Sequence, residues 1–313
     1  MKNKKKLIAM LMTAAFTLSA FTACGSSDKT TQDSSSGAEN SGSQQQKEKN
    51  DAEESSFKAG SRIIVMTRED GSGTRGAFIE LTGVEGKNDA GEKVDNTTVD
   101  AEVNNSTSVM MTAVAGNPYA IGYISLGSLN DTVKALQIDG VDATAENIVA
   151  GKYALARPFN IAYKDDLSDL GRDFIDFIMS DDGQSIIDEN GYIATMTGTA
   201  YAGSGEGKLV VAGSSSVSPV MEKLIEAYMA KNTGADIELQ ESDSSSGMSA
   251  LAEGVCDIGM ASRDLKDSEL EQGLIPQTIA TDGIAVIVNN DNTTDNLSKD
   301  DIKAIYTGEK TTW

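Results

Sequence analysis

The chain contains no histidine among its 313 residues, and this absence removes a large part of enzyme chemistry. A Ser-His-Asp triad, an imidazole general base and a histidine-ligated zinc site are all excluded. Carboxylates and lysines remain available, but nothing in the sequence arranges them for catalysis. We therefore expect no catalytic residues, no metal and no cofactor, and we interpret the many Asp and Glu residues as a solvated surface.

Cysteine is almost as scarce, since the chain has only Cys24 and Cys256. One thiol beyond Cys24 cannot build an internal disulfide framework, so burial of apolar side chains has to supply the stability. About 250 residues follow residue 56, which is enough for two hydrophobic cores. Cys256 is expected to be a small core residue rather than a reactive one.

Positive charge is also in short supply, because 26 Lys and Arg stand against 48 Asp and Glu, for a net charge of −22. Such a chain is repelled by the phosphate backbone of nucleic acids, so we expect no nucleic-acid partner. A buried anion site is still compatible with this charge if local backbone donors and an arginine dominate the pocket.

The N-terminus has the pattern of a secretory signal. Four lysines within residues 1–6 precede an uncharged run over residues 7–23, and small residues then lead into Cys24. The run is marginal for a membrane span and continues directly into polar sequence. It resembles a bacterial lipoprotein signal, which predicts a signal peptide over residues 1–23 and lipidation of Cys24. The mature protein would be extracytoplasmic and anchored to the cell membrane only by this lipid. The alternative is an ordinary signal with an incidental cysteine.

Residues 24–56 lack the composition of a folded segment. From Ser26 to Ser56 there is no Val, Ile, Leu, Met, Phe, Trp or Tyr, and Ser, Gln, Glu, Asp, Asn and Lys dominate. Such a segment cannot bury enough apolar surface to order itself. We interpret it as a disordered tether that holds the folded part away from the membrane.

Beyond residue 56, strand-like and helix-like segments alternate. Apolar runs predict buried strands at residues 62–67, 119–126, 159–163, 209–212 and 284–289. Helical periodicity is clear at residues 217–229 and again at 171–188, and shorter helical stretches are expected at 75–81, 109–114 and 248–253. This alternation predicts α/β lobes with largely parallel sheets.

Small hydroxylated or glycine residues precede a predicted helix at four places. They are Asp70–Thr74 (DGSGT), Asn104–Ser108 (NNSTS), Ala212–Ser216 (AGSSS) and Asp243–Gly247 (DSSSG). The first turn of a helix has unpaired N–H groups and partial positive charge, so an oxyanion is a natural ligand there. Ordinary helix capping would explain any one of these segments. Four of them together favour an anion site.

Arg68 precedes the first of these segments by two residues. Its planar guanidinium could donate two hydrogen bonds to a tetrahedral anion, with Asp70 fixing its orientation. The alternative is an ordinary surface salt bridge.

These residues also resemble a known family. The run Thr67–Arg75 (TREDGSGTR), followed by Ala77 and Phe78, is similar to the signature of the phosphate-binding components of ABC phosphate importers. So are Ala212–Val217 with Pro219, Asp257–Arg263 (DIGMASR), Ile305–Gly308 with Trp313, and Ala120–Tyr123. The resemblance covers nearly all of residues 57–313, and the RxDGSGT segment is its most specific part.

The resemblance implies a type II periplasmic-binding-protein fold. In that fold two α/β lobes close like a hinge over dehydrated phosphate. One lobe would be contiguous, over residues 162–283, and the other would combine residues 57–157 with 284–313. The strands that cross between the lobes would lie near residues 159–162 and 282–286.

The resemblance also implies a ligand set and partners. By matching position, phosphate would be bound by Arg68, Ser72, Gly73, Thr74, Ser215, Ser216 and Ser244, with Ser106, Thr107, Asp70, Arg263 and Asp282 as further candidates. The implied function is capture of inorganic phosphate and its delivery to the permease subunits of an ABC importer, by a protein expected to be a monomer.

Two features depart from the family's pattern. The family begins with the AGSSS strand and reaches its YTG…W segment before the RxDGSGT strand, whereas here the RxDGSGT half comes first. This order implies a circular permutation, which folds tolerate when the old termini are close, or a piece of a tandem array. In addition, Arg263 stands where some members have an aspartate that accepts the proton of hydrogen phosphate. Asp282 or Asp70 would have to accept it here.

Three other functions stay open at this point. Sulfate or another tetrahedral oxyanion could be the ligand, and a buried carboxylate would decide against sulfate, which carries no proton at neutral pH. A phosphatase or phosphotransferase would need a metal cluster or an activated nucleophile, and the sequence offers neither. A surface adhesin or sensor with a vestigial pocket would not bind phosphate at all.

Overall fold

The computed structural model describes residues 57–195 and 198–313. The predicted signal peptide, the predicted lipidation site Cys24 and the predicted tether lie outside the described residues. Within the described residues, no helix combines the length and the apolar character needed to cross a membrane.

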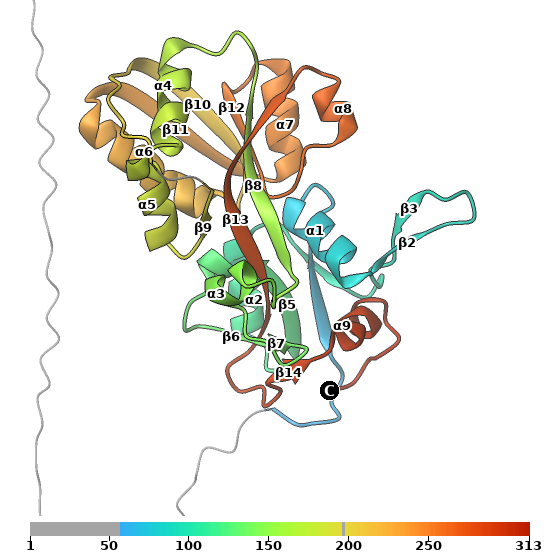
Figure 1. The fold of residues 1–313 in the computed structure, drawn as a ribbon. Helices are drawn as coiled ribbons and strands as arrows, with labels where there is room; N and C mark the ends of the chain where they lie inside the picture. Colours follow the sequence, from blue (N-terminus) through green and yellow to red (C-terminus); the bar gives the residue numbers. More distant parts are fainter. Residues whose placement is uncertain (1–56, 196–197) are drawn as a thin grey trace, which may run out of the picture. The chain divides into compact units, whose positions relative to one another are not determined.

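Ten strands of the described residues form one mixed sheet (Figure 1). They are β1 (Ile64–Arg68), β4 (Glu102–Asn104), β5 (Ala120–Ser125), β6 (Lys134–Ala135), β8 (Ala156–Tyr163), β9 (Ile193–Ala194), β10 (Glu206–Ser214), β11 (Gly234–Ser242), β12 (Ile258–Ala261) and β13 (Ile275–Val288). Their order is β11-β10-β12-β8-β13-β5-β1-β4, with β6 and β9 also paired to β13. Two separate short pairs are β14 (Asn296–Leu297) with β7 (Gln137–Ile138), and β2 (Glu85–Lys87) with β3 (Lys93–Asp95).

The sheet is parallel toward its two ends and antiparallel in its centre. Strand β1 is parallel to β4 and β5, and β10 is parallel to β11 and β12. Strand β13 is antiparallel to both β8 and β5. The prediction of largely parallel sheets is therefore wrong for the central strands. Parallel strands need a crossover connection, which is usually a helix. Strand β13 instead follows a loop and runs antiparallel to β8.

Strand β13 belongs to both parts of the sheet. Residues 275–283 pair with β8, and residues 284–288 pair with β5. We call the part with β4, β1, β5, β6 and residues 284–288 half A, and the part with β11, β10, β12, β8, β9 and residues 275–283 half B. Figure 1 shows β8 and β13 running side by side between the two.

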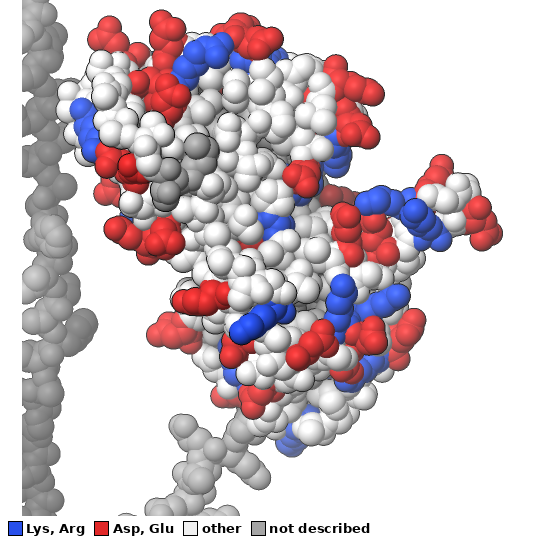
Figure 2. Space-filling model, viewed as in Figure 1, with Lys and Arg blue, Asp and Glu red and all other residues white. Residues whose placement is uncertain are grey.

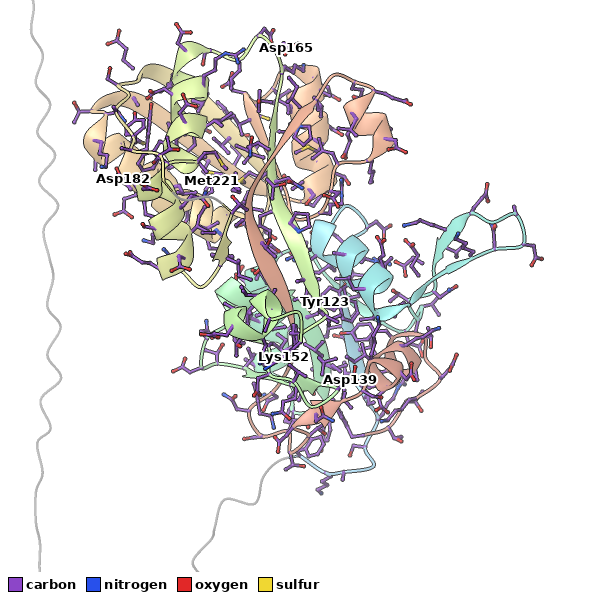
Figure 3. All side chains as sticks on the ribbon, in the orientation of Figure 1. Tyr123, Asp139, Lys152, Asp165, Asp182 and Met221 are labelled. Carbon is purple, nitrogen blue, oxygen red and sulfur yellow. The ribbon has the colours of Figure 1, made fainter. Side chains whose placement is uncertain are left out.

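Each half has helices and a hydrophobic core of its own. Half A carries α1 (Gly73–Thr82), α2 (Thr107–Ala115), the 3₁₀ turn η1 (Leu126–Ser128), α3 (Ala145–Val149) and α9 (Lys299–Tyr306); half B carries α4 (Asp169–Ile178), α5 (Asp181–Glu189), α6 (Ser218–Lys231), α7 (Ser244–Glu253) and α8 (Asp267–Leu270). Figure 3 shows the buried Tyr123 in half A and the buried Met221 in half B.

Cys256 is a buried free thiol in half B, as expected. The lobe boundaries derived from the sequence stay a prediction.

The helical stretch predicted over residues 171–188 is two helices, α4 and α5, because Ser180 starts a new one. Its hydroxyl donates to the carbonyl of Phe177 at 2.6 Å and accepts from the N–H of Gly183 at 3.4 Å. A side chain at Gly183 would lie 2.3 Å from the Phe177 carbonyl oxygen, so only glycine permits this tight junction.

The two ends of the folded region meet in half A. The rings of Phe57 and Trp313 lie 5.9 Å apart edge to face, and the N–H of Gly60 donates to the Trp313 carbonyl at 3.1 Å. The Trp313 indole N–H also donates to the Tyr119 carbonyl at 2.9 Å. Phe57 and Trp313 therefore meet the requirement that a circular permutation sets, which is that the old termini lie close together.

Candidate anion-binding site

The starts of four helices meet where half A faces half B. The hydroxyls of Thr74 (α1) and Ser216 (before α6) are 2.7 Å apart, and those of Thr107 (α2) and Ser216 are 3.2 Å apart. The N–H of Ser245 in α7 donates to the carbonyl of Gly71 at 3.2 Å. The structure therefore brings together all four of the small-residue segments singled out in the sequence.

Arg68, at the end of β1, lies at the centre of this group. It is 1% exposed, and its Nη2 donates to the hydroxyl of Ser215 in half B at 3.0 Å. Its Nε donates to the Asn104 carbonyl at 3.2 Å, and its Nη1 makes only a long contact of 3.4 Å with Thr107. The Tyr123 hydroxyl accepts from the Arg68 N–H at 3.1 Å and so holds the end of the strand. A buried arginine of this kind is positioned to receive an anion.

The carboxylate that orients Arg68 is Glu69, so the prediction that Asp70 does so is wrong. Glu69 accepts from Nε and Nη2 of Arg68 at 2.8 and 2.7 Å. Asp70 is 97% exposed in its side chain and pairs with Arg75 at 2.8 Å. The reason is a turn in which the N–H of Ser72 donates to the Glu69 carbonyl, which directs Asp70 outward.

Half B contributes a cluster of buried hydroxyls, two of which the sequence interpretation missed. The Ser214 hydroxyl donates to that of Ser262 at 3.0 Å, and the Ser262 N–H donates to the Ser244 hydroxyl at 3.1 Å. We call Ser214, Ser244 and Ser262 the serine cluster; each is at most 3% exposed. Ser214 and Ser262 both lie in motifs used for the family resemblance, but neither was assigned a role.

Gly73 lets α1 approach this cluster closely. A Cβ atom at Gly73 would lie 2.5 Å from the Ser244 Oγ and 2.7 Å from the Ser262 Oγ, far inside ordinary contact. Ser72 caps α1, since its hydroxyl accepts from the Arg75 N–H at 3.3 Å. The glycine in this segment is therefore needed for contact between the halves and not only for the turn.

Three further candidates have their main partners elsewhere, although Arg263 also donates from Nη2 to the Ser245 hydroxyl at 3.2 Å. Ser106 caps α2 by accepting from the Val109 N–H at 3.3 Å, whereas its neighbour Thr107 faces the site. Arg263 pairs with Glu269 at 2.8 Å. Burial by itself would raise the pKa of Glu269, but hydrogen bonds and charge from Arg263 and Lys266 outweigh burial and lower that pKa. Asp282 is fully buried in β13 and pairs with Arg157 of β8 at 3.1 Å.

The surface charge does not decide what this site binds. Figure 2 shows acidic side chains spread over the visible face of both halves, with basic ones among them. The site residues are buried, and the described residues contain no cluster of side chains suited to a metal ion. Hydroxyls, helix N–H groups and a buried guanidinium are the donors that an oxyanion needs.

A family model for the PBP superfamily domain matches residues 41–182 and 198–313. The "Phosphate-binding protein PstS 2" of Streptococcus agalactiae serotype V is 52% identical over 264 residues, which cover 84% of this chain and 90% of that protein. The chain therefore belongs to the phosphate-binding proteins of the PBP superfamily.

A solved structure supports the fold. The crystal structure of a phosphate-binding protein of a phosphate ABC transporter from Streptococcus pneumoniae TIGR4 is 48% identical, with a TM-score of 0.64. The match covers 81% of this chain and 98% of that one. The predicted periplasmic-binding-protein fold and the family resemblance are both confirmed.

The relatives match this chain over different lengths. The alignment with the S. agalactiae protein runs along nearly its whole length, so that protein has the same order of segments. Bacillus subtilis "Phosphate-binding protein PstS" matches over 134 residues only, at 33% identity, covering 42% of this chain and 41% of that protein.

Proposed function

We propose that this chain captures inorganic phosphate between half A and half B and delivers it to the permease of an ABC importer. The observation that carries the proposal is the hydrogen bond from buried Arg68 to Ser215, made among four helix starts. Such a site neutralises a tetrahedral anion with fixed donors and needs no metal. The function is binding and release, without a catalytic step.

The ligand set of the proposal follows from these contacts. Hydrogen bonds between the halves are made by five proposed ligands, Arg68, Thr74, Thr107, Ser215 and Ser216. Ser244 belongs to the serine cluster, and Ser72 and Gly73 present the start of α1. Ser106 and Arg263 have lesser roles in the proposal, because each is engaged by its own helix or ion pair.

Calorimetry of the mature chain with phosphate, sulfate and arsenate tests this function. We expect phosphate and arsenate to bind and sulfate to bind far more weakly, because sulfate presents no proton to a buried carboxylate. Asp282 is the candidate acceptor, since Asp70 faces solvent. Equal binding of sulfate would favour a general oxyanion receptor, turnover of a phosphomonoester would indicate an enzyme, and no binding would indicate a sensor or adhesin.

Anchoring through Cys24 is a separate part of the proposal. The uncharged run over residues 7–23 and the polar segment that follows support it. Replacing Cys24 with Ser should release the protein from membranes or leave it unprocessed, because the acceptor thiol is gone. Membrane retention of the variant, with no lipid mass on the N-terminal peptide of the wild type, would contradict it.

We also infer that the segment order is a circular permutation of the order in other members. The contact between Phe57 and Trp313 supports this inference, as does the partial match to the B. subtilis protein. A chain in which Trp313 is joined to Phe57 by a short linker and residues 198–205 are opened should fold and bind phosphate. An unfolded product would count against the inference.

A further inference from the structure

The strands that cross between the halves hold a buried arginine that the sequence interpretation passed over. Arg157 of β8 is 4% exposed and lies opposite Asp282 of β13 in the strand register. Its Nη2 donates to Asp282 at 3.1 Å, and its guanidinium lies 5.3 Å from the centre of the Phe159 ring. Replacing such a pair with apolar residues often costs little, so the pair needs a reason beyond stability.

Arg157 is connected to the candidate site by direct contacts. Its Nη1 donates to the carbonyl of Ser262 at 3.1 Å. The other polar groups of Ser262 belong to the serine cluster, through the Ser214 and Ser244 hydroxyls. Arg157 therefore fixes the backbone of the residue that links the hydroxyls of half B.

The groups around Arg157 do not fully compensate its buried positive charge. Its Nε has no hydrogen-bond partner among the described residues. Burial lowers the pKa of Arg157, Asp282 opposes this effect, and the positive charge of Arg68 adds to it. Both guanidinium groups are buried, so each adds to the cost of the other's positive charge, and an anion bound between the halves would lower that cost.

We propose that Arg157 is a second positioning arginine of the phosphate site, held by Asp282, which fixes the serine cluster through Ser262 and adds positive potential where the anion binds. This inference rests on the proposed function. In this proposal β8 and β13 contribute to the affinity for phosphate as well as connecting the two halves.

The test compares variants in which no carboxylate is left unpaired. Asp282→Asn is the background, because an amide oxygen can still accept from Arg157. Loss of the candidate proton acceptor is then common to all three proteins, and each affinity is compared with that of the Asp282→Asn protein and not with that of the wild type. Adding Arg157→Gln to it should weaken phosphate binding about tenfold or more in calorimetry, because a full charge and the hydrogen bond from Nη1 to the Ser262 carbonyl are lost. Adding Arg157→Lys instead should recover part of the affinity, because the charge is kept.

The control is Tyr153→Phe, which removes a buried hydrogen bond of 2.8 Å to the Ile284 carbonyl near the same crossing. It should lower the melting temperature and leave phosphate affinity unchanged. The inference is overturned if the Asp282→Asn protein binds phosphate equally well with Arg, Lys or Gln at position 157. It is also overturned if Tyr153→Phe weakens binding as much as Arg157→Gln does. A wild-type chain that does not bind phosphate would instead refute the proposed function.

Discussion

Replacing Arg68 with Ala should weaken phosphate binding by about two orders of magnitude or more. The guanidinium is 1% exposed and stands among the four helix starts, so its bonds to a phosphate would be shielded from water. Hydrogen bonds to charged groups contribute about 1.5–3 kcal/mol each, and two of them account for the expected loss. Calorimetric titration with phosphate measures it.

Arg68→Lys should recover only part of this affinity, because an ammonium cannot donate in a plane to both Ser215 and the anion. The melting temperature without phosphate should change by only a few degrees, because Glu69 is 19% exposed and can be hydrated once its partner is gone.

Arg263→Ala is the matched control for Arg68. Arg263 is also mostly buried and also forms a two-bonded pair with a glutamate, Glu269, at 2.8 and 2.9 Å. Among the described residues it reaches the site through a hydrogen bond of 3.2 Å from its Nη2 to the Ser245 hydroxyl at the rim of the contact between α1 and α7, so its loss should weaken phosphate binding less than about tenfold. If Arg68→Ala binds phosphate like the wild type while melting at the same temperature, the proposed site is wrong.

The segments of the site could be predicted from the sequence because each is a local pattern. A strand that ends in glycine and hydroxyl residues and continues into a helix exposes N–H groups whatever the rest of the fold does. Four such segments indicated an anion site, and the structure brings Gly71, Thr74, Thr107, Ser216 and Ser245 into contact. Their contact across the halves depends on the fold, and no local pattern encodes it.

The partners of the charged residues could not be predicted in the same way. Asp70 and Glu69 are neighbours in the sequence, and only the turn closed by Ser72 decides which of them faces Arg68. Arg157 gave no signal, because a lone arginine before a proline looks like any strand edge. Its burial depends on β13 lying beside β8, which is a contact between residues far apart in the chain.

The same limit applies to the fold. The apolar run at residues 284–289 predicted a strand, but β13 begins at Ile275, nine residues earlier in the chain. Polar residues such as Gln277, Thr278 and Asp282 hide that part of the strand from a hydrophobicity pattern. They are accommodated because each meets a polar partner or the protein surface, as Thr278 does with Asn160 at 2.7 Å.

Gly73→Ala should weaken phosphate binding by about one to two orders of magnitude without destabilising the protein. A methyl group at this position would lie 2.5 Å from the Ser244 Oγ and 2.7 Å from the Ser262 Oγ, so the two halves could not meet as they do here. Overpacking of this kind costs about 1–3 kcal/mol. The whole of this free energy is lost from the arrangement in which α1 meets the serine cluster, which is the arrangement that binds phosphate in the proposal. Alanine favours helix more than glycine does, and Gly73 has an ordinary helical backbone, so the melting temperature without phosphate should stay equal or rise.

Gly76→Ala in the same helix is the control, because no atom lies within 4 Å of a Cβ atom placed there. It should share the gain in helix propensity and keep the wild-type affinity for phosphate. The pair of variants therefore separates closure from helix stability, since both add the same methyl group to α1 and only one of them meets half B. Calorimetry and thermal melting of the two variants measure the two effects. Wild-type affinity in Gly73→Ala would show that phosphate does not require the contact between α1 and the serine cluster.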